Sequence, residues 1–454
     1  MVAMKPVLAK KQLLGLISFI TSGAFLYTFC FLDADRGRIS PQYINSPALP
    51  CSALDGADDV VIVLKTGSTE LDAKLPVHLS MTLQCYHHSL IFSDAAETFH
   101  GHLIIDALES VSTNIKEDND DFELYRRLRA HGRSSLNASE IHGEAQSVSA
   151  TGHVDNPGWR LDKWKFLVST LSLAPNLIEV PMVNRTFHEY PDKKWYVFIE
   201  ADTYILWSSL LDYLSTLDPS QPLYAGSRVY VGDVAFAHGG SGFIVSHSAM
   251  QSMVQHYQAQ QEDIERFVDQ HWAGDCVLGK VFADIDINLT EIWPHMQGDH
   301  PGNVAYVGPD GRSIRAAAEK AYWCKQAVSY HQMRPDMIHD LWQWEQELLQ
   351  QGGRGGITHG EMFFEYVLPR MGIFGTDWDN ESENSDELSN VSTIEECRAE
   401  CELTKSCVQF AFDQERHRCR HYRLPRLGKA AQNVHSGWML ERIRQLADGM
   451  GSCE

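Results

Sequence analysis

The chain has 454 residues, 44% of them hydrophobic, which is enough for one large domain or two ordinary ones. Its 60 acidic and 38 basic residues give a formal net charge of −22. This charge argues against a nucleic-acid-binding protein, because phosphate neutralisation requires an excess of Lys and Arg. A metal cation is a more natural charged partner for clustered carboxylates. Gly and Pro occur 32 and 17 times, close to average usage, which argues against fibrous repeats and bulk disorder.

An uncharged apolar stretch from Leu13 to Leu32 predicts a membrane-spanning helix. Roughly twenty residues in a helix span about 30 Å, the thickness of the bilayer hydrocarbon core. Lysines precede the stretch, so the positive-inside tendency keeps the N-terminus in the cytosol and sends the remainder into the lumen. A cleaved signal peptide is the alternative, but the stretch is longer than the usual apolar core of such a peptide. We therefore expect a cytosolic tail at 1–12, a type II anchor at 13–32 and a polar stem at 33–50.

Two further features favour a lumenal address, in the Golgi or the endoplasmic reticulum. Sequons for N-glycosylation occur at Asn137, Asn184, Asn288, Asn380 and Asn390. A small disulfide-bonded unit is indicated by four cysteines close together near the C-terminus, at Cys397, Cys401, Cys407 and Cys419. A zinc cluster is the alternative, but these cysteines form no C-x-x-C pair. Elsewhere, Cys276 could pair with Cys324, and Cys51 with Cys85.

The body of the chain alternates strand-like with helix-like segments. Continuous apolar runs begin at Val60 and Lys194, as in buried parallel strands, and shorter ones begin at Ser89 and His102. Helical spacing of apolar residues occurs in the segments 122–129, 161–174 and 208–217. The alternation predicts an α/β domain with a mostly parallel sheet.

The predicted domain spans residues 51–370. An acidic, polar stretch follows, which we interpret as a linker at 371–390. The cysteine-rich unit occupies residues 391–454.

Ligands of open α/β sheets bind at the carboxyl ends of the strands, where this sequence places an E-x-D triplet. Glu200 and Asp202 point the same way in an extended segment and can converge on a hard cation such as Mn²⁺ or Mg²⁺. A strand end followed by a helix cap is the alternative.

Three more segments offer candidate groups. The glycines of the run 238–246 allow a substrate to approach the backbone, although such a run is more often a simple loop. Asp275, at the start of a predicted helix, is either a first-turn residue or a base that deprotonates a hydroxyl group. His331 follows an apolar, strand-like step and is either a further metal ligand or an ordinary imidazole.

Taken in order, these motifs resemble those of the fringe and core-1 β-1,3-galactosyltransferase family, especially its fungal branch. The resemblance covers about residues 58–335. The matching blocks are KTGSTELDAKLPVHL (65–79), LIFSD (90–94), GWRLDKWKFL (158–167), WYVFIEADTY (195–204), HGGSGFIVS (238–246), GDCVLGKVF (274–282) and WCKQAVSYHQM (323–333). It implies a lumenal GT-A fold enzyme, with a Rossmann-like sheet, that uses a UDP-sugar and Mn²⁺ and inverts the anomeric centre.

The resemblance also implies roles for single residues. Glu200 and Asp202 match the family's D-x-D element, and His331 matches the histidine that completes its metal site. Asp275 matches the catalytic base. The residues that match its nucleotide-sugar motifs are Thr66, Asp94, Lys163, Glu200, Asp202, Gly239, Gly240 and Gly242. Animal relatives often carry a run of aspartates where this chain has Glu200-Ala201, which leaves its metal preference open.

The C-terminal unit resembles a PAN/apple module, a small α+β fold that binds carbohydrate or protein or serves only as a packing cap. This resemblance suggests the bridges Cys397–Cys419 and Cys401–Cys407.

The expected function is transfer of a sugar, galactose in β-1,3 linkage, from a UDP-sugar to a glycan or glycoprotein acceptor. The donors UDP-Gal, UDP-GlcNAc and UDP-Glc are not distinguished by the sequence. The alternative is a catalytically silent lumenal lectin or scaffold that binds glycan through the PAN-like module.

Overall fold

A computed structural model describes residues 49–453 apart from 110, 139, 142–160, 162–164, 166–181, 270–272, 305, 307–321, 354 and 383–390. Within this part of the chain, no helix is both long enough and apolar enough to cross a membrane. The predicted anchor at 13–32 lies outside the described residues, as does most of the helix predicted at 161–174.

An eight-stranded mixed sheet forms the centre of the larger domain. Its strands lie in the order β11 (Leu289–Glu291), β7 (Tyr224–Gly226), β10 (Phe243–Ser246), β5 (Trp195–Glu200), β1 (Val60–Lys65), β2 (His88–Ser93), β4 (His102–Asp106) and β3 (Glu97–Phe99). The run β5-β1-β2-β4 is parallel, whereas β10 is antiparallel to both of its neighbours. The predicted α/β fold with a mostly parallel sheet is confirmed.

Both faces of the sheet are covered, which explains why β1 and β5 are apolar up to their last residues. All six residues of β1 are buried. Val61 and Val63 belong to one hydrophobic cluster, while Ile62 belongs to the cluster on the opposite face. A strand buried on two sides needs apolar side chains at every position, because successive side chains point to opposite faces.

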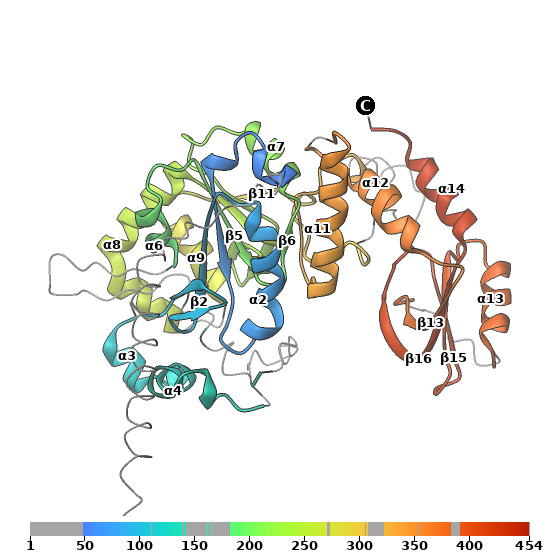
Figure 1. Cartoon of the computed structure of the whole chain (residues 1–454), viewed down its shortest axis with the longest axis horizontal. Helices are drawn as coiled ribbons and strands as arrows, with labels where there is room; N and C mark the ends of the chain where they lie inside the picture. The colour runs from blue at the N-terminus through green and yellow to red at the C-terminus, as the bar shows by residue number, and fades with distance from the viewer. Residues whose placement is uncertain are drawn as a thin grey trace, which may run out of the picture. The chain divides into compact units, whose positions relative to one another are not determined.

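Helices supply the cover. On one face lie α4 (Glu123–His131), α6 (Met182–Glu189), α8 (His247–Asp269) and α9 (Gly274–Ala283), and on the other lie α2 (Leu71–Ser80) and α7 (Trp207–Ser215). Figure 1 shows α6, α8 and α9 across the sheet from α2. The short helix α3 (Thr113–Asp118) precedes α4. The strand and helix segments predicted at 60, 89, 102, 122, 194 and 208 are confirmed within one or two residues at their starts.

Two short ladders lie outside the main sheet. Strand β6 (Tyr204–Ile205) pairs with β12 (Ser329–Tyr330). Strands β8 (Arg228–Val231) and β9 (Val234–Ala237) form a hairpin. The chain then continues through α11 (Pro335–Gln350) and the short α12 (His359–Glu361).

The C-terminal module is a four-stranded antiparallel sheet with two helices. Its strands lie in the order β13 (Phe374–Asp379), β16 (Lys429–Trp438), β14 (Gln409–Asp413) and β15 (Arg418–Tyr422), and its helices are α13 (Ile394–Leu403) and α14 (Leu440–Met450). Disulfides join Cys397 to Cys419 and Cys401 to Cys407, the pairing that the resemblance suggested. These cysteines pack with Phe410 in a small core of their own. The disulfide-rich α+β module is confirmed.

The segment interpreted as a linker, 371–390, needs correction. Strand β13 lies inside it and pairs with β16, so the module's sheet begins at Phe374. The acidic composition of the segment did not indicate a strand. A strand with one exposed face can have polar residues there, and it forms because a neighbouring strand is available to pair with it.

The module packs against the larger domain through a hydrophobic cluster that both contribute to. Trp323 and Phe363 of the larger domain belong to this cluster together with Trp438 and Ile443 of the module. A disulfide between Cys324 and Cys453 adds a covalent link. The predicted pair Cys276–Cys324 is therefore wrong, and Cys276 is a buried free thiol. The other suggested pair, Cys51–Cys85, is formed.

Burial also corrects two of the predicted glycosylation sites. The amide of Asn380 is fully buried and donates hydrogen bonds to the carbonyl oxygens of Phe410 and Gly437. Asn184 is buried in α6. A glycan cannot be accommodated at either position in the folded chain. Asn137 and Asn288 are exposed, and Asn390 lies outside the described residues.

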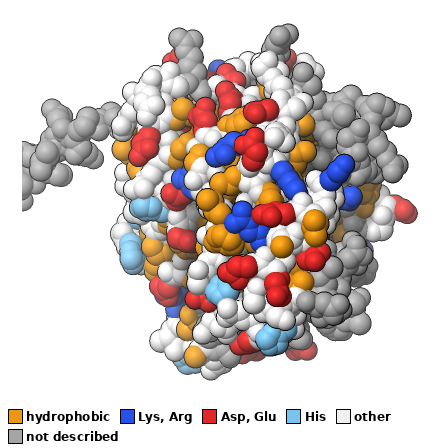
Figure 2. Space-filling view, turned by 90° about the vertical axis from the view of Figure 1, so that its right-hand side faces the viewer, with side chains coloured by type: hydrophobic (Ala, Val, Ile, Leu, Met, Phe, Trp, Pro, Cys, Tyr) orange, Lys and Arg blue, Asp and Glu red, His pale blue; other side chains and the backbone are white. Residues whose placement is uncertain are grey.

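Charged side chains of both signs are mixed on the surface that Figure 2 presents, where Lys and Arg lie among Asp and Glu.

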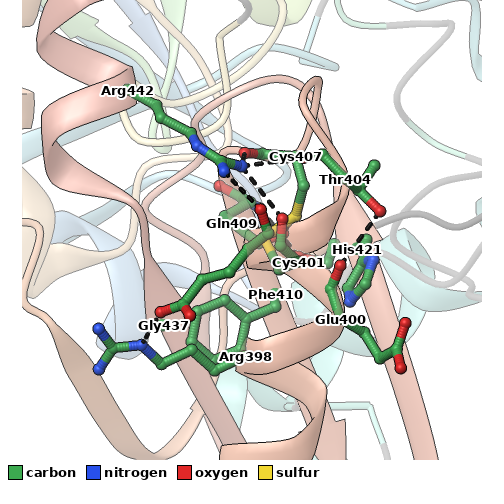
Figure 3. Close-up of a disulfide and its surroundings, with 12 residues drawn as sticks. Arg398, Glu400, Cys401, Thr404, Cys407, Gln409, Phe410, His421, Gly437 and Arg442 are labelled. Atoms are coloured by element: carbon green, nitrogen blue, oxygen red, sulfur yellow. Dashed lines mark hydrogen bonds and ion pairs between the residues drawn. A yellow bond between two sulfur atoms is a disulfide. The ribbon is translucent and has the colours of Figure 1, made fainter.

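Arg442 of α14 binds the loop that the Cys401–Cys407 disulfide closes. Its guanidinium donates hydrogen bonds to the carbonyl oxygens of Cys401, Glu402, Thr404 and Cys407 (Figure 3). The carbonyls of Cys401 and Glu402 lie in the last turn of α13 and those of Thr404 and Cys407 follow it, at the end of the helix where a cation is favoured by the helix dipole. Arg442 therefore fastens α14 to the end of α13.

We expect Arg442→Met to lower the free energy of unfolding by about 1–3 kcal/mol, because carbonyl groups lose a charged donor. Chemical denaturation of the purified chain measures this change. Arg444→Met is the matched control, since Arg444 is exposed on the same helix. Equal stability of the two variants would show that the contacts of Arg442 contribute nothing.

Candidate active site

The candidate site lies at the carboxyl ends of β5, β1 and β2. Their parallel register aligns Lys65, the last residue of β1, with Glu200 on one side and Phe92 on the other. Residues that follow these strands are therefore gathered at one edge of the sheet. Asp202 lies beyond the end of β5, and Asp94 lies beyond the end of β2.

Glu200, Asp202 and His331 converge at this edge. Their nearest ligand atoms all lie within 4.8 Å of one another. The Nε2 atom of His331 is 3.2 Å from Oδ1 of Asp202 and 3.9 Å from Oε2 of Glu200. The three residues proposed from the sequence as a metal-binding set are thus brought together by the fold.

The pairing of β6 with β12 places His331 next to Asp202. Tyr330 pairs with Tyr204, so the residue after β12 lies beside the segment that carries Asp202. The backbone N–H of Met333 donates to the carbonyl oxygen of Asp202, 2.9 Å away, and closes the arrangement.

Glycine is required at position 240 by the imidazole of His331. A β-carbon on Gly240 would overlap the His331 ring. Thr203 fixes the loop, because its hydroxyl donates to the carbonyl oxygen of Gly240 at 2.7 Å. At Gly242 the backbone has φ of +79°, a conformation that glycine adopts without strain.

Asp275 approaches the same loop from the first turn of α9. Its Oδ2 atom accepts a hydrogen bond from the backbone N–H of Gly239 at 3.1 Å. A β-carbon on Gly239 would lie 3.2 Å from Oε1 of Glu200 and 3.5 Å from Oδ2 of Asp275. Both carboxylates therefore border the space beside Gly239 that a side chain would occupy.

Electrostatic contacts shift the pKa values of the acid–imidazole pair in opposite directions. Burial alone would raise the pKa of Asp202, but the contacts with His331 and Lys74 outweigh it and hold that pKa below its usual range. Burial alone would lower the pKa of His331, but the contact with Asp202 outweighs it and raises that pKa above its usual value. Asp202 is therefore held as the carboxylate, and the imidazole of His331 is protonated more readily than usual.

Sequence reasoning missed two lysines that bind the acids directly. The Nζ atom of Lys65 is 2.9 Å from Oε1 of Glu200, and that of Lys74, on α2, is 3.0 Å from Oδ2 of Asp202. Lys74 also lies 2.7 Å from Oε2 of Glu70. Both lysines belong to the block 65–79 that carries the resemblance, so their position in that block was the available signal.

The residues predicted on the nucleotide side form a buried network around Asp94. Its Oδ1 atom is 2.7 Å from Nζ of Lys165, and its Oδ2 atom accepts the backbone N–H of Ser68 at 2.7 Å. Lys165 also donates to the carbonyl oxygen of Thr66 at 3.1 Å. This network fixes the loop after β1. Lys163 lies outside the described residues, whereas Lys165 from the same motif was missed.

The donor set of Glu200, Asp202 and His331 suits a divalent cation. Two carboxylates and an imidazole nitrogen are ligands that Mn²⁺ accepts, and the carboxylates suit Mg²⁺ as well. Within the described part of the chain, a second cluster of potential ligands, Cys397, Cys419 and His421, is unsuitable because its two cysteines form a disulfide.

Two regions of the chain match known family models. Residues 174–301, which include Glu200, Asp202 and Asp275, match the model described as Fringe-like. Residues 376–430 match the PAN domain. The chain thus carries a Fringe-like domain followed by a PAN domain, which confirms the resemblance drawn from the sequence.

Among solved structures, the chain is similar to the crystal structure of a glycosyltransferase involved in the glycosylation of the major capsid of PBCV-1. The identity is 10%, the match covers 62% of this chain and 98% of that chain, and the TM-score is 0.26. The match to the Fringe-like model supports the conclusion that the chain is a glycosyltransferase.

We expect Gly240→Ala to displace His331 and to weaken binding of Mn²⁺ together with UDP by at least about tenfold, because the added methyl group forces the ring out of its position. Isothermal titration calorimetry measures this binding. Gly449→Ala is the control, since a β-carbon there meets no atom within 4 Å. Unchanged binding by the Gly240 variant would contradict the assignment of His331 to the site.

Proposed function

We propose that the protein is an inverting glycosyltransferase that moves a sugar, galactose in β-1,3 linkage, from a UDP-sugar to a glycan or glycoprotein acceptor. The observation that carries this proposal is the convergence of Glu200, Asp202 and His331, together with the position of Asp275, whose carboxylate borders the same space beside Gly239 as that of Glu200. A group that binds a diphosphate through a cation and a group that accepts a proton are thus adjacent. Transfer to a hydroxyl group needs both.

Asp275 is the proposed general base. Its Oδ1 atom accepts the N–H of Cys276 at 2.9 Å and its Oδ2 atom accepts that of Gly239, which fixes the carboxylate. Oδ2 accepts the proton of the acceptor hydroxyl as the hydroxyl oxygen forms its bond to the anomeric carbon. The bond from that carbon to the diphosphate breaks on the opposite face, so the configuration inverts.

Glu200, Asp202 and His331 are the proposed ligands of Mn²⁺ or Mg²⁺. When bound, the cation supplies positive charge to the diphosphate leaving group. The glycines at 239, 240 and 242 let the sugar approach the backbone.

The proposed address is the membrane of the Golgi or the endoplasmic reticulum, with the N-terminal stretch 13–32 as a type II anchor. The disulfides among the described residues support it, because such bonds persist in an oxidising lumen.

Replacement of the base tests the mechanism. We expect Asp275→Asn to reduce transfer by at least about a hundredfold, because the amide cannot accept the proton, while UDP binding is retained. Asp284→Asn is the matched control, because Asp284 is a partly exposed acid at the other end of α9 whose carboxylate pairs with Lys280. Unchanged turnover of the Asp275 variant would exclude the base role.

A donor screen tests the activity itself. UDP-Gal, UDP-GlcNAc and UDP-Glc are offered with simple acceptor sugars in the presence of Mn²⁺, and release of UDP is measured. We expect turnover with one of these donors and its loss when EDTA removes the metal. Absence of both transfer and hydrolysis with every donor would favour the silent lectin or scaffold.

A further inference from the structure

Both carboxylates of the proposed metal site already have cationic partners in the chain. Lys65 contacts Glu200 at 2.9 Å, and Lys74 contacts Asp202 at 3.0 Å. The two oxygens of Asp202 are divided between different groups, since Oδ1 lies next to His331 and Oδ2 next to Lys74. The lysines and Asp202 are largely shielded from water, with 7% of Lys65, 17% of Lys74 and 21% of Asp202 exposed, whereas Glu200 is 30% exposed.

This arrangement disfavours the binding of a divalent cation in the absence of a nucleotide. A cation bound between Glu200 and Asp202 would lie beside two ammonium groups, and repulsion between like charges is strong where water is scarce. The cation would also have to share one negative charge of Asp202 with Lys74. The carboxylates therefore become full ligands only when the lysines release them.

Lys74 has a second partner that makes its release feasible. Glu70 lies one turn earlier on the chain, with Oε2 at 2.7 Å from Nζ of Lys74. When Lys74 leaves Asp202, its charge stays paired with Glu70 and remains free to meet an anion at the edge of the sheet. A buried ammonium with no such partner would be held at Asp202 by its own desolvation cost.

We propose that Lys74 is a positioning residue that blocks the cation ligand Asp202 until a nucleoside diphosphate binds. The diphosphate offers anionic oxygens to Lys74 and Lys65, the two lysines release their carboxylates, and the cation enters with the nucleotide. This inference rests on the proposed function and adds to it an obligatory coupling between metal and nucleotide.

The test measures Mn²⁺ binding to the purified full-length chain by electron paramagnetic resonance, with and without UDP. The wild-type chain is expected to bind Mn²⁺ weakly alone and at least about tenfold more tightly with UDP, by the charge argument above. Lys74→Met is expected to bind Mn²⁺ alone at least about tenfold more tightly than the wild type, and to depend less on UDP. Lys74→Gln, which keeps a polar side chain, serves as the second variant if the methionine variant does not fold.

Lys194→Met is the matched control, because Lys194 forms a salt bridge of similar length with Asp59 at the opposite end of β5. It is expected to bind Mn²⁺ like the wild type. Tight Mn²⁺ binding by the wild type without UDP would overturn the inference. So would UDP-dependent binding that Lys74→Met leaves unaltered, although the proposed function would stand. Absence of Mn²⁺ binding in every variant, with and without UDP, would overturn both the metal site and this inference.

Discussion

The candidate site depends on the short antiparallel pairing of β6 with β12. The ladder is only two residues long, yet it aligns Tyr330 with Tyr204 and so brings His331 to Asp202 from a distant part of the chain. A contact of this kind is entropically costly to form, and the surrounding hydrophobic cluster, which includes both tyrosines, stabilises it. The glycine at 240 is a consequence of the same pairing, because the imidazole occupies the space that a side chain would need.

Charge balance is the second constraint at this edge of the sheet. A buried carboxylate is stable only when it is paired or well hydrogen-bonded, and each acid here meets that condition differently. Asp94 is paired with Lys165 and accepts the backbone N–H of Ser68 in a fully buried network, which suits a structural role. Asp202 is paired with side chains that have other partners within reach, which suits a site where ions are exchanged. Asp94 thus fixes the loop after β1, whereas Asp202 is suited to binding ions.

Periodicity and motif order were sufficient to predict the sheet, because β1 and β5 are apolar up to their last residues. Acids stand at or just beyond the ends of β5 and β2. The convergence of Glu200 and Asp202 was predicted from alternation in an extended segment, but β5 ends at Glu200 and a turn places Asp202. Features set by contacts between distant segments were not predictable. Neither the pairing of β13 with β16 nor the bond between Cys324 and Cys453 has a local pattern. The sequons at Asn184 and Asn380 read as surface sites, since a three-residue motif carries no information on burial.

The interface between the two parts of the chain has a consequence for any attempt to shorten the protein. Trp438 and Ile443 of the C-terminal module complete a hydrophobic cluster that also contains Trp323 and Phe363. A fragment that ended at residue 370 would expose this apolar face to water. It would also leave the thiol of Cys324 without its partner, a few residues before the strand that delivers His331. The C-terminal module is thus part of the scaffold of the candidate site, and a fragment that retains this scaffold includes both parts of the chain.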